Sequence, residues 1–183
     1  MTGIVLLAGL LVLFGLWAVL ANNSFVLARN KVDEAWSGID IQLRRRHDLV
    51  PNLVETVKGY AEHESATLVA VTQARTAAMS AFTGPERGAT EAQLSGALQG
   101  LRVVAEEYPE LRASDTYRLL QGQLSELEDQ IQAARRIYNA NVNAYNTVIQ
   151  VFPNSLVAGD RYRARELFQL DSPAERAVPA VAF

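Results

Sequence analysis

Apolar and polar positions divide the chain into two kinds of sequence. Residues 3–21 read GIVLLAGLLVLFGLWAVLA, with no polar or charged side chain, and a spaced apolar pattern starts only after the Asn22-Asn23-Ser24 cluster. A helix of this length covers about 28 Å, close to the roughly 30 Å hydrocarbon core of a bilayer. The pattern therefore predicts a membrane helix within residues 1–24, with Trp17 near its interfacial end.

A cleaved signal peptide is the competing interpretation, because Val19-Leu20-Ala21 resembles a small-residue cleavage site. No Lys or Arg precedes the segment, however, and it is longer than the about 7–15 apolar residues of a signal peptide. We therefore favour a retained anchor. Its expected anchoring residues are Ile4, Leu10, Phe14, Trp17 and Leu20.

The second half of the chain carries heptad spacing. Residues 115–152 hold an apolar track whose steps alternate between four and three, which is typical of a long coiled-coil-like helix ended by Pro153. Residues 86–107 repeat this alternation between Pro85 and Pro109. The longer track runs Leu120, Leu124, Leu127, Ile131, Ala134, Tyr138, Asn141, Tyr145, Val148 and Phe152.

The region around Pro51 interrupts the pattern. An apolar face from Val32 to Leu43 loses its phase within residues 44–47 and resumes at Leu53. Because proline lacks a backbone donor, either one helix kinks between residues 43 and 53 or two antiparallel helices meet at a turn. We favour the turn. It predicts an all-α fold in which the membrane helix is followed by an antiparallel up-and-down four-helix bundle of long coiled-coil-like helices.

These boundaries predict three parts: an anchor at residues 1–24, a bundle at 25–153 and a partly ordered tail at 154–183. The tail lacks helical periodicity beyond a short stretch near residues 163–170. We expect it to be held locally by Tyr162, Leu167, Phe168 and Leu170.

Composition narrows the function. The chain has 17 basic and 20 acidic residues, a net charge of −3, and every charge lies between Arg29 and Arg176. A net-acidic chain is a poor nucleic-acid binder, since such binding depends on many Lys and Arg contacts to phosphate. There is no cysteine, and the two histidines, His47 and His63, lack metal-site or triad spacing. We therefore expect no enzyme activity, no metal and no cofactor.

The densest polar cluster is formed by Arg44, Arg45, Arg46, His47 and Asp48. It could dock an acidic partner or lipid headgroups. In a straight helix, however, Arg44 would lie about 35 Å beyond Ala21, whereas surface attraction fades over about 8 Å. We favour a structural interpretation, in which the arginines are solvated or paired with acids on a neighbouring helix.

A second polar group lies on the long helix at residues 138–146. Tyr138-Asn139 and Tyr145-Asn146 repeat after seven residues, and Asn141 falls on the apolar track itself. This polar seam could recognise a partner. We favour the alternative that the tyrosines fill the core while their hydroxyls and the asparagines satisfy one another.

Three segments together resemble the LemA family of bacterial membrane proteins. They are NKVDEAWSGIDIQLRRRHDLVPNLVETVKGYAEHE at residues 30–64, LRVVAEEYPELR at 101–112, and residues 124–153 with ARRIYNANVNAYNTVIQVFP. Their order, and the anchor just before the first, also match. The resemblance implies a single-pass membrane protein with a helical-bundle domain. It implies no catalytic residue.

Flanking charge predicts the orientation. Arg29 and Lys31 follow the apolar segment, which favours an outside N-terminus and a cytoplasmic bundle at the bacterial inner membrane. We expect an envelope scaffold or interaction protein whose partners are the lipid bilayer and an unidentified envelope protein. The alternative is an accessory subunit of a membrane-associated enzyme such as a membrane protease. A homo-oligomer stays open, because the heptad faces could be used within one bundle.

Overall fold

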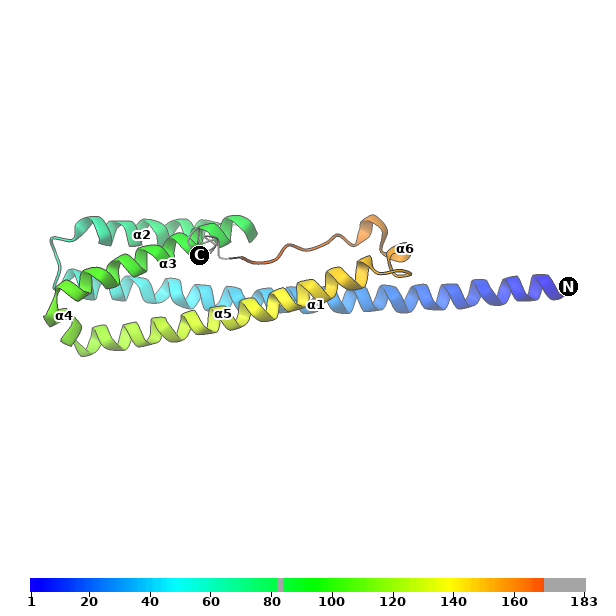
Figure 1. The fold of residues 1–183 in the computed structure, drawn as a ribbon, viewed down its shortest axis with the longest axis horizontal. Coiled ribbons are helices and arrows are strands. Elements are labelled where there is room, and N and C mark those ends of the chain that lie inside the picture. Colours follow the sequence, from blue (N-terminus) through cyan, green and yellow to red (C-terminus); the bar gives the residue numbers. More distant parts are fainter. Residues whose placement is uncertain (82–83, 170–183) are drawn as a thin grey trace, which may run out of the picture. The chain divides into compact units, whose positions relative to one another are not determined.

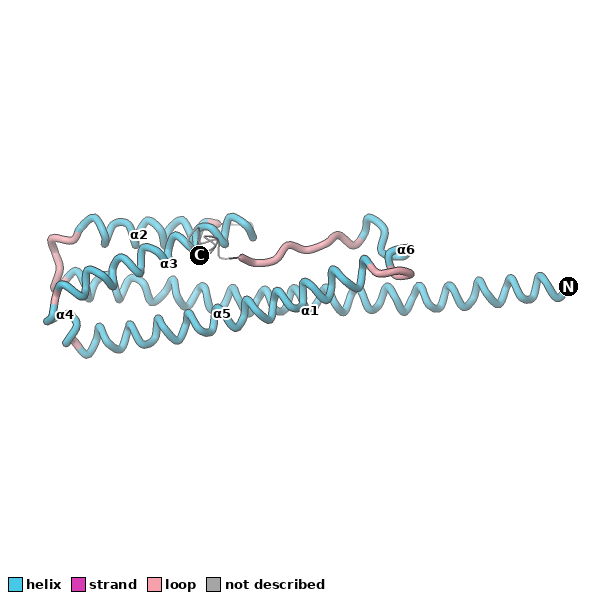
Figure 2. The backbone as a smooth tube through the Cα atoms, in the orientation of Figure 1, coloured by secondary structure: helices cyan, strands magenta, loops and turns pink. Residues whose placement is uncertain are grey.

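The computed structural model describes residues 1–81 and 84–169, which are helices and connecting segments without a strand (Figures 1 and 2). The all-α prediction is thus confirmed, as is the long apolar helix at the N-terminus. The helices are α1 (Thr2–Lys58), α2 (Ser65–Ser80), α3 (Gly84–Glu107), α4 (Pro109–Ala113), α5 (Asp115–Gln150) and α6 (Ser155–Ala158), followed by a 3-10 turn at Gly159–Arg161.

Contacts within the chain form two compact units. We call Met1–Gly38 with Arg136–Leu167 the anchor unit, and the described residues of Ile39–Arg135 together with Phe168 and Gln169 the core unit. Each of α1 and α5 contributes to both units. The division into residues 1–24, 25–153 and 154–183 stays a prediction.

The first part of α1 has the properties of a membrane span. Its most apolar 18-residue window has a mean hydropathy of 2.8, and only 6% of that window is buried. Ile4, Leu10, Phe14 and Leu20 are exposed, and Trp17 is half-buried with its ring 5.4 Å from that of Phe14. Exposure of so many large apolar side chains would be costly in water and is favourable in lipid.

The expected turn near Pro51 is wrong, because α1 continues through this residue and the chain reverses only at residues 59–64. In an α-helix the N–H at position 51 would bond to the carbonyl of His47, and proline has no N–H to donate. Arg75 on α2 supplies the missing donor, since its Nε donates to the His47 carbonyl oxygen at 2.7 Å. A side chain from another helix thereby provides the hydrogen bond that the His47 carbonyl lacks within α1.

Many buried apolar residues of the core unit form one cluster shared by α1 to α5. Helices α2 and α3 pack on each other in opposite directions (Figure 1). The predicted track of α3 is buried at Leu94, Leu98, Leu101 and Ala105. The complete four-helix bundle stays a prediction in its details. The other members of the cluster are Val50, Leu53, Val57, Ala61, Leu68, Val71, Ala78, Leu111, Tyr117, Leu120 and Leu124.

The buried face of α5 departs from the predicted heptad track near its end. Val142 and Ile149 are buried where Asn141 and Val148 were expected. Phe152 is 80% exposed, beyond the end of the helix. A straight helix of 3.6 residues per turn drifts by about 20° per heptad from a 3.5-residue repeat, so after three heptads the buried position moves on by one residue.

The role assigned to Arg75 predicts coupling with Pro51. Arg75→Met should lower the free energy of unfolding by about 1–3 kcal/mol, because it leaves a partly buried carbonyl without a donor. In a Pro51→Ala background the helix supplies its own donor at position 51, so Arg75→Met should cost clearly less. Urea denaturation of the double-mutant cycle measures this difference. Equal costs in the two backgrounds would show that the His47 carbonyl does not depend on Arg75.

Candidate functional site

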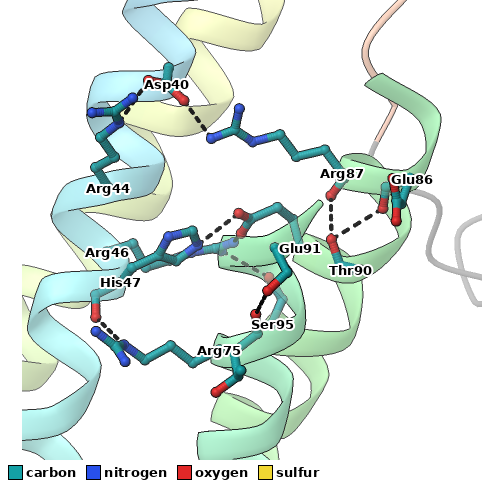
Figure 3. A network of polar contacts seen from close by, with 12 residues as sticks. Asp40, Arg44, Arg46, His47, Arg75, Glu86, Arg87, Thr90, Glu91 and Ser95 are labelled. Carbon is teal, nitrogen blue, oxygen red and sulfur yellow. Dashed lines mark hydrogen bonds and ion pairs between the residues drawn. The ribbon is translucent and has the colours of Figure 1, made fainter. Parts of the chain in front are cut away.

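The most unusual residue of the core unit is Arg46 on α1, whose side chain is fully buried. A buried guanidinium costs several kcal/mol unless charged and polar partners surround it. One terminal nitrogen pairs with Glu91 on α3 (Figure 3). The other donates to Ser95 Oγ at 3.0 Å and to Glu128 Oε1 on α5 at 2.6 Å. Arg46 therefore joins three helices through its head group.

Glu91 is also fully buried, between Arg46 and His47. His47 Nε2 donates to Glu91 Oε1 at 2.8 Å, so the carboxylate is held by two residues of α1 (Figure 3). Burial alone would raise the pKa of Glu91, but the His47 hydrogen bond and the positive charge of Arg46 outweigh it and lower the pKa below its usual value. Glu91 is thus ionised at neutral pH.

A second, more exposed layer surrounds Asp40. Its carboxylate pairs with Arg44 Nε at 2.8 Å and with Arg87 from α3 (Figure 3). Because Arg44 is largely exposed, this i,i+4 pair contributes little to stability. The cluster predicted at residues 44–48 is therefore split between surface and interior.

Arg46 and His47 lie inside the core unit, whereas Arg44, Arg45 and Asp48 are exposed. Two of the five predicted docking residues, Arg46 and His47, are buried and engaged with Glu91. A docking role for the exposed three stays a prediction.

Glu91 and Glu128 were missed by the sequence analysis, although a signal exists. Glu91 lies three residues before Leu94 and so continues the apolar track of α3, whereas Glu128 follows Leu127 directly, at the edge of the apolar track of α5. A carboxylate at a core position needs a buried partner, and Arg46 is that partner.

The chemistry available to this network is limited. The His47–Glu91 pair resembles an acid–base dyad, but both groups are buried and already bonded to each other. Among the described residues, no group of three or more His, Asp or Glu is placed to hold a metal ion. The geometry therefore fits a buried ionic lock between helices, which we call the Arg46 lock: Arg46, His47, Glu91, Ser95 and Glu128.

A groove of about 1230 Å³ opens beside the lock, between α3, α4 and α5. Ser95 and Glu128 of the lock line it, together with apolar residues such as Leu98 and Leu124. Charged groups of both signs also line the groove: Arg102, Arg112, Arg118, Glu106 and Asp129. It is therefore a surface with mixed charge over an apolar floor.

The polar seam of the anchor unit binds the chain's own later segment. The hydroxyls of Tyr138 and Tyr145 each donate to a backbone carbonyl of residues 163–166 at 3.1 Å. Asn146 makes two hydrogen bonds to the backbone of that segment, at 2.8 and 2.9 Å. Asn141 is half-buried, with its Nδ2 3.5 Å from the carbonyl oxygen of Lys31.

The expectation that the seam residues satisfy one another is therefore wrong for these tyrosines and for Asn146. Their polar groups bond to the backbone of residues 163–166 instead, so the same atoms are less available to an external partner. Asn139 is half-buried beside them. A partner-recognition role for the seam stays a prediction.

The tail residues behave differently from one another. Tyr162 and Phe168 are buried, whereas Leu167 is exposed. Phe168 lies near Gly88 of α3, where any side chain would meet the backbone of Gln169. Leu170, the fourth expected tail anchor, lies outside the described residues.

Comparison with known proteins places these features in a family. The profile of the LemA family matches residues 35–183, most of the chain. The chain belongs to the LemA family. The matched range contains the whole Arg46 lock, the groove and the polar seam, so these are features of the family region of the chain rather than of the apolar segment before it.

Curated relatives come from several bacteria. The chain is 27% identical to Magnetosome protein MamQ 2 of Paramagnetospirillum magneticum over 83% of its own length and 65% of the relative. It is 28% identical to Protein LemA of Metamycoplasma hominis over 74% of its length and 63% of that protein. It is 24% identical to Magnetosome protein MamQ of Magnetospirillum gryphiswaldense over 72% and 58%. The chain spans slightly less than two thirds of the length of these relatives.

The lock predicts a pH-dependent stability. Glu91→Gln removes the charge from a buried pair and should lower the free energy of unfolding by about 3–5 kcal/mol near neutral pH. Because the folded pKa of Glu91 is lowered, the stability it supplies is complete above its unfolded pKa and is lost as pH falls through the folded pKa. The variant should therefore lose less stability than the parent on acidification. Urea denaturation across pH 3–7 measures both effects.

Glu126→Gln is the matched control, since Glu126 is exposed on α5 and bonds only to Gln130 in the contacts found for its side chain. This control should change stability by less than about 0.5 kcal/mol. If Glu91→Gln were equally mild, the lock would not be a principal stabilising contact.

Proposed function

We propose that the protein is a membrane-anchored helical scaffold of the bacterial envelope, with its core unit in the cytoplasm. One observation carries the proposal: α1 contains both the apolar segment and two residues of the Arg46 lock, Arg46 and His47. A single helix is therefore both a candidate membrane span and a structural member of the folded core. Such a chain is suited to presenting a folded surface beside a bilayer.

The distribution of charge supports the orientation. The anchor unit holds six basic and four acidic residues, a formal charge of +2 in a chain whose total is −3. Arg29 and Lys31 follow the apolar segment, as the positive-inside rule expects for a cytoplasmic flank. This supports an outside N-terminus in the inner membrane.

The groove of the core unit supports an interaction role. It combines an apolar floor with charges of both signs, a composition suited to a protein partner more than to nucleic acid. The names of the relatives given above refer to no enzyme. No contact in the described residues favours an accessory subunit of a membrane enzyme.

Photo-crosslinking in intact cells tests the scaffold proposal. A benzophenone amino acid at Ser125, which is exposed and lines the groove, should give an adduct of defined mass with another protein. The same group at Gln123 is the matched control, because Gln123 is exposed on the same helix but does not line the groove. The proposal predicts the adduct at Ser125 and its absence at Gln123. Only an unmodified monomer at both positions would contradict it.

A reporter fused after Phe183 tests the orientation. A cytoplasmic core unit should give a fluorescent green fluorescent protein fusion and an inactive alkaline phosphatase fusion. The opposite pair of activities would place the core unit outside and reject the orientation, while leaving the membrane span itself intact.

A further inference from the structure

The far end of the apolar segment is covered by the chain that follows α5. Ala21 is only 6% exposed and Phe25 is fully buried, in contrast to the bare helix before them. Tyr162 packs its ring 5.0 Å from that of Phe25, and its hydroxyl donates to Asn22 Oδ1 at 2.7 Å. Tyr162, which follows α6 and the 3-10 turn, therefore reaches the end of the apolar segment of α1.

This connecting segment exposes large apolar side chains. Phe152 is 80% exposed and Leu156 is 65% exposed, and Val151 is also exposed. They lie within six consecutive residues, around the turn between α5 and α6. Such a concentration of exposed apolar surface marks a contact site more often than a solvated turn.

Basic residues accompany this turn. Arg161 and Arg163 are exposed on either side of Tyr162, and Arg161 lies 5.8 Å from the centre of the Tyr162 ring. The only acid within residues 151–163 is Asp160. An Arg is attracted to an anionic membrane surface when it lies within a Debye length of about 8 Å.

We propose that the α5–α6 turn is a second membrane contact. Phe152 and Leu156 insert into the leaflet from which α1 emerges, and Arg161 and Arg163 contact anionic phospholipid headgroups. This inference rests on the proposed function, because it requires α1 to span the bilayer. The occupant is lipid rather than protein for two reasons. Tyr162, a few residues after the apolar turn, bonds to Asn22 at the end of the anchor's own apolar segment, and the charges next to Tyr162 are mostly basic.

A second contact has a mechanical consequence. A single transmembrane helix is free to rotate about its axis, whereas two separate insertions set the rotation of the anchor unit about the membrane normal. The hydrogen bond between Tyr162 and Asn22 couples the two insertions within one unit. The scaffold would then present a defined face along the membrane.

Site-directed spin labelling of the full chain tests the proposal. Because the chain has no cysteine, Phe152→Cys and Leu156→Cys each place one nitroxide at the turn. Leu10→Cys reports on the anchor, and Leu119→Cys is the aqueous control, since Leu119 is equally exposed on α5 within the core unit. The protein is reconstituted in vesicles of phosphatidylcholine with phosphatidylglycerol, and accessibility to oxygen and to a nickel chelate is measured by power saturation.

The labels at Phe152→Cys and Leu156→Cys should show an oxygen-to-nickel accessibility ratio several-fold above that of Leu119→Cys. Like the ratio at Leu10→Cys, it should be typical of a lipid environment. A lipid-like ratio at Leu10→Cys with a water-like ratio at both turn positions would overturn the second contact and leave the anchor in place. A water-like ratio at Leu10→Cys would reject the anchor itself. Protection of the turn labels from both reagents would indicate burial against protein and also overturn the proposal.

A charge variant tests the headgroup contact. Arg161→Gln with Arg163→Gln should reduce the ratio at Phe152→Cys in the anionic vesicles to its value in pure phosphatidylcholine. Arg112→Gln with Arg118→Gln, in the core unit, is the matched control and should leave the ratio unchanged. An equal ratio with and without phosphatidylglycerol in the parent would reject the role of the two arginines.

Discussion

The buried charge of Arg46 constrains how the helices of the core unit can pack. A guanidinium removed from water is tolerated only when its donors meet acceptors in good geometry. For the two terminal nitrogens of Arg46 those acceptors come from Glu91 and Ser95 on α3 and from Glu128 on α5, so three helices must keep one register. Apolar contacts alone would allow neighbouring registers of similar burial. The Arg46 lock makes such slips costly, because each would leave a buried charge without its partner.

The same stretch of α1 must also pass through Pro51 as a helix. The freed carbonyl belongs to His47, a member of the lock, and Arg75 from α2 bonds to it. Residues 46 to 51 are thus contacted by α2, α3 and α5 together. The same contacts from α2, α3 and α5 therefore both pair the charge of Arg46 and keep α1 helical through Pro51. In the anchor unit, side chains of α5 bond in a similar way to the backbone of residues 163–166.

Local periodicity was enough to predict the helices that have no internal conflict. Residues 86–107 and 115–152 were expected as helices, and α3 and α5 match them to within two residues at each end. The N-terminal apolar helix could be predicted from the length and composition of its segment alone. The turn at Pro51 was predicted wrongly because the His47 carbonyl receives its hydrogen bond from Arg75, 28 residues after His47, and a local pattern does not contain that contact.

The candidate site was only partly accessible from the sequence. The charges around Arg46 were visible, but which of them point inward depends on the phase of α1 through Pro51. The seam tyrosines were expected to bond within their own group, whereas an extended segment without periodicity supplies their partners. This segment is bound through its backbone carbonyl and N–H groups, and a pattern of side-chain types does not reveal such contacts. Heptad counting also failed gradually along α5, because a straight helix drifts from a 3.5-residue repeat.

The central claim is that tertiary contacts of the Arg46 lock and Arg75 hold α1 as one helix through Pro51. Amide hydrogen exchange of the full chain tests this most directly, because it reports opening of individual segments. We predict equally slow exchange at residues 46–50 and at residues 53–57, lost together under global unfolding conditions. Fast exchange confined to residues 47–55, with protection on both sides, would show a local break at Pro51 and contradict the account.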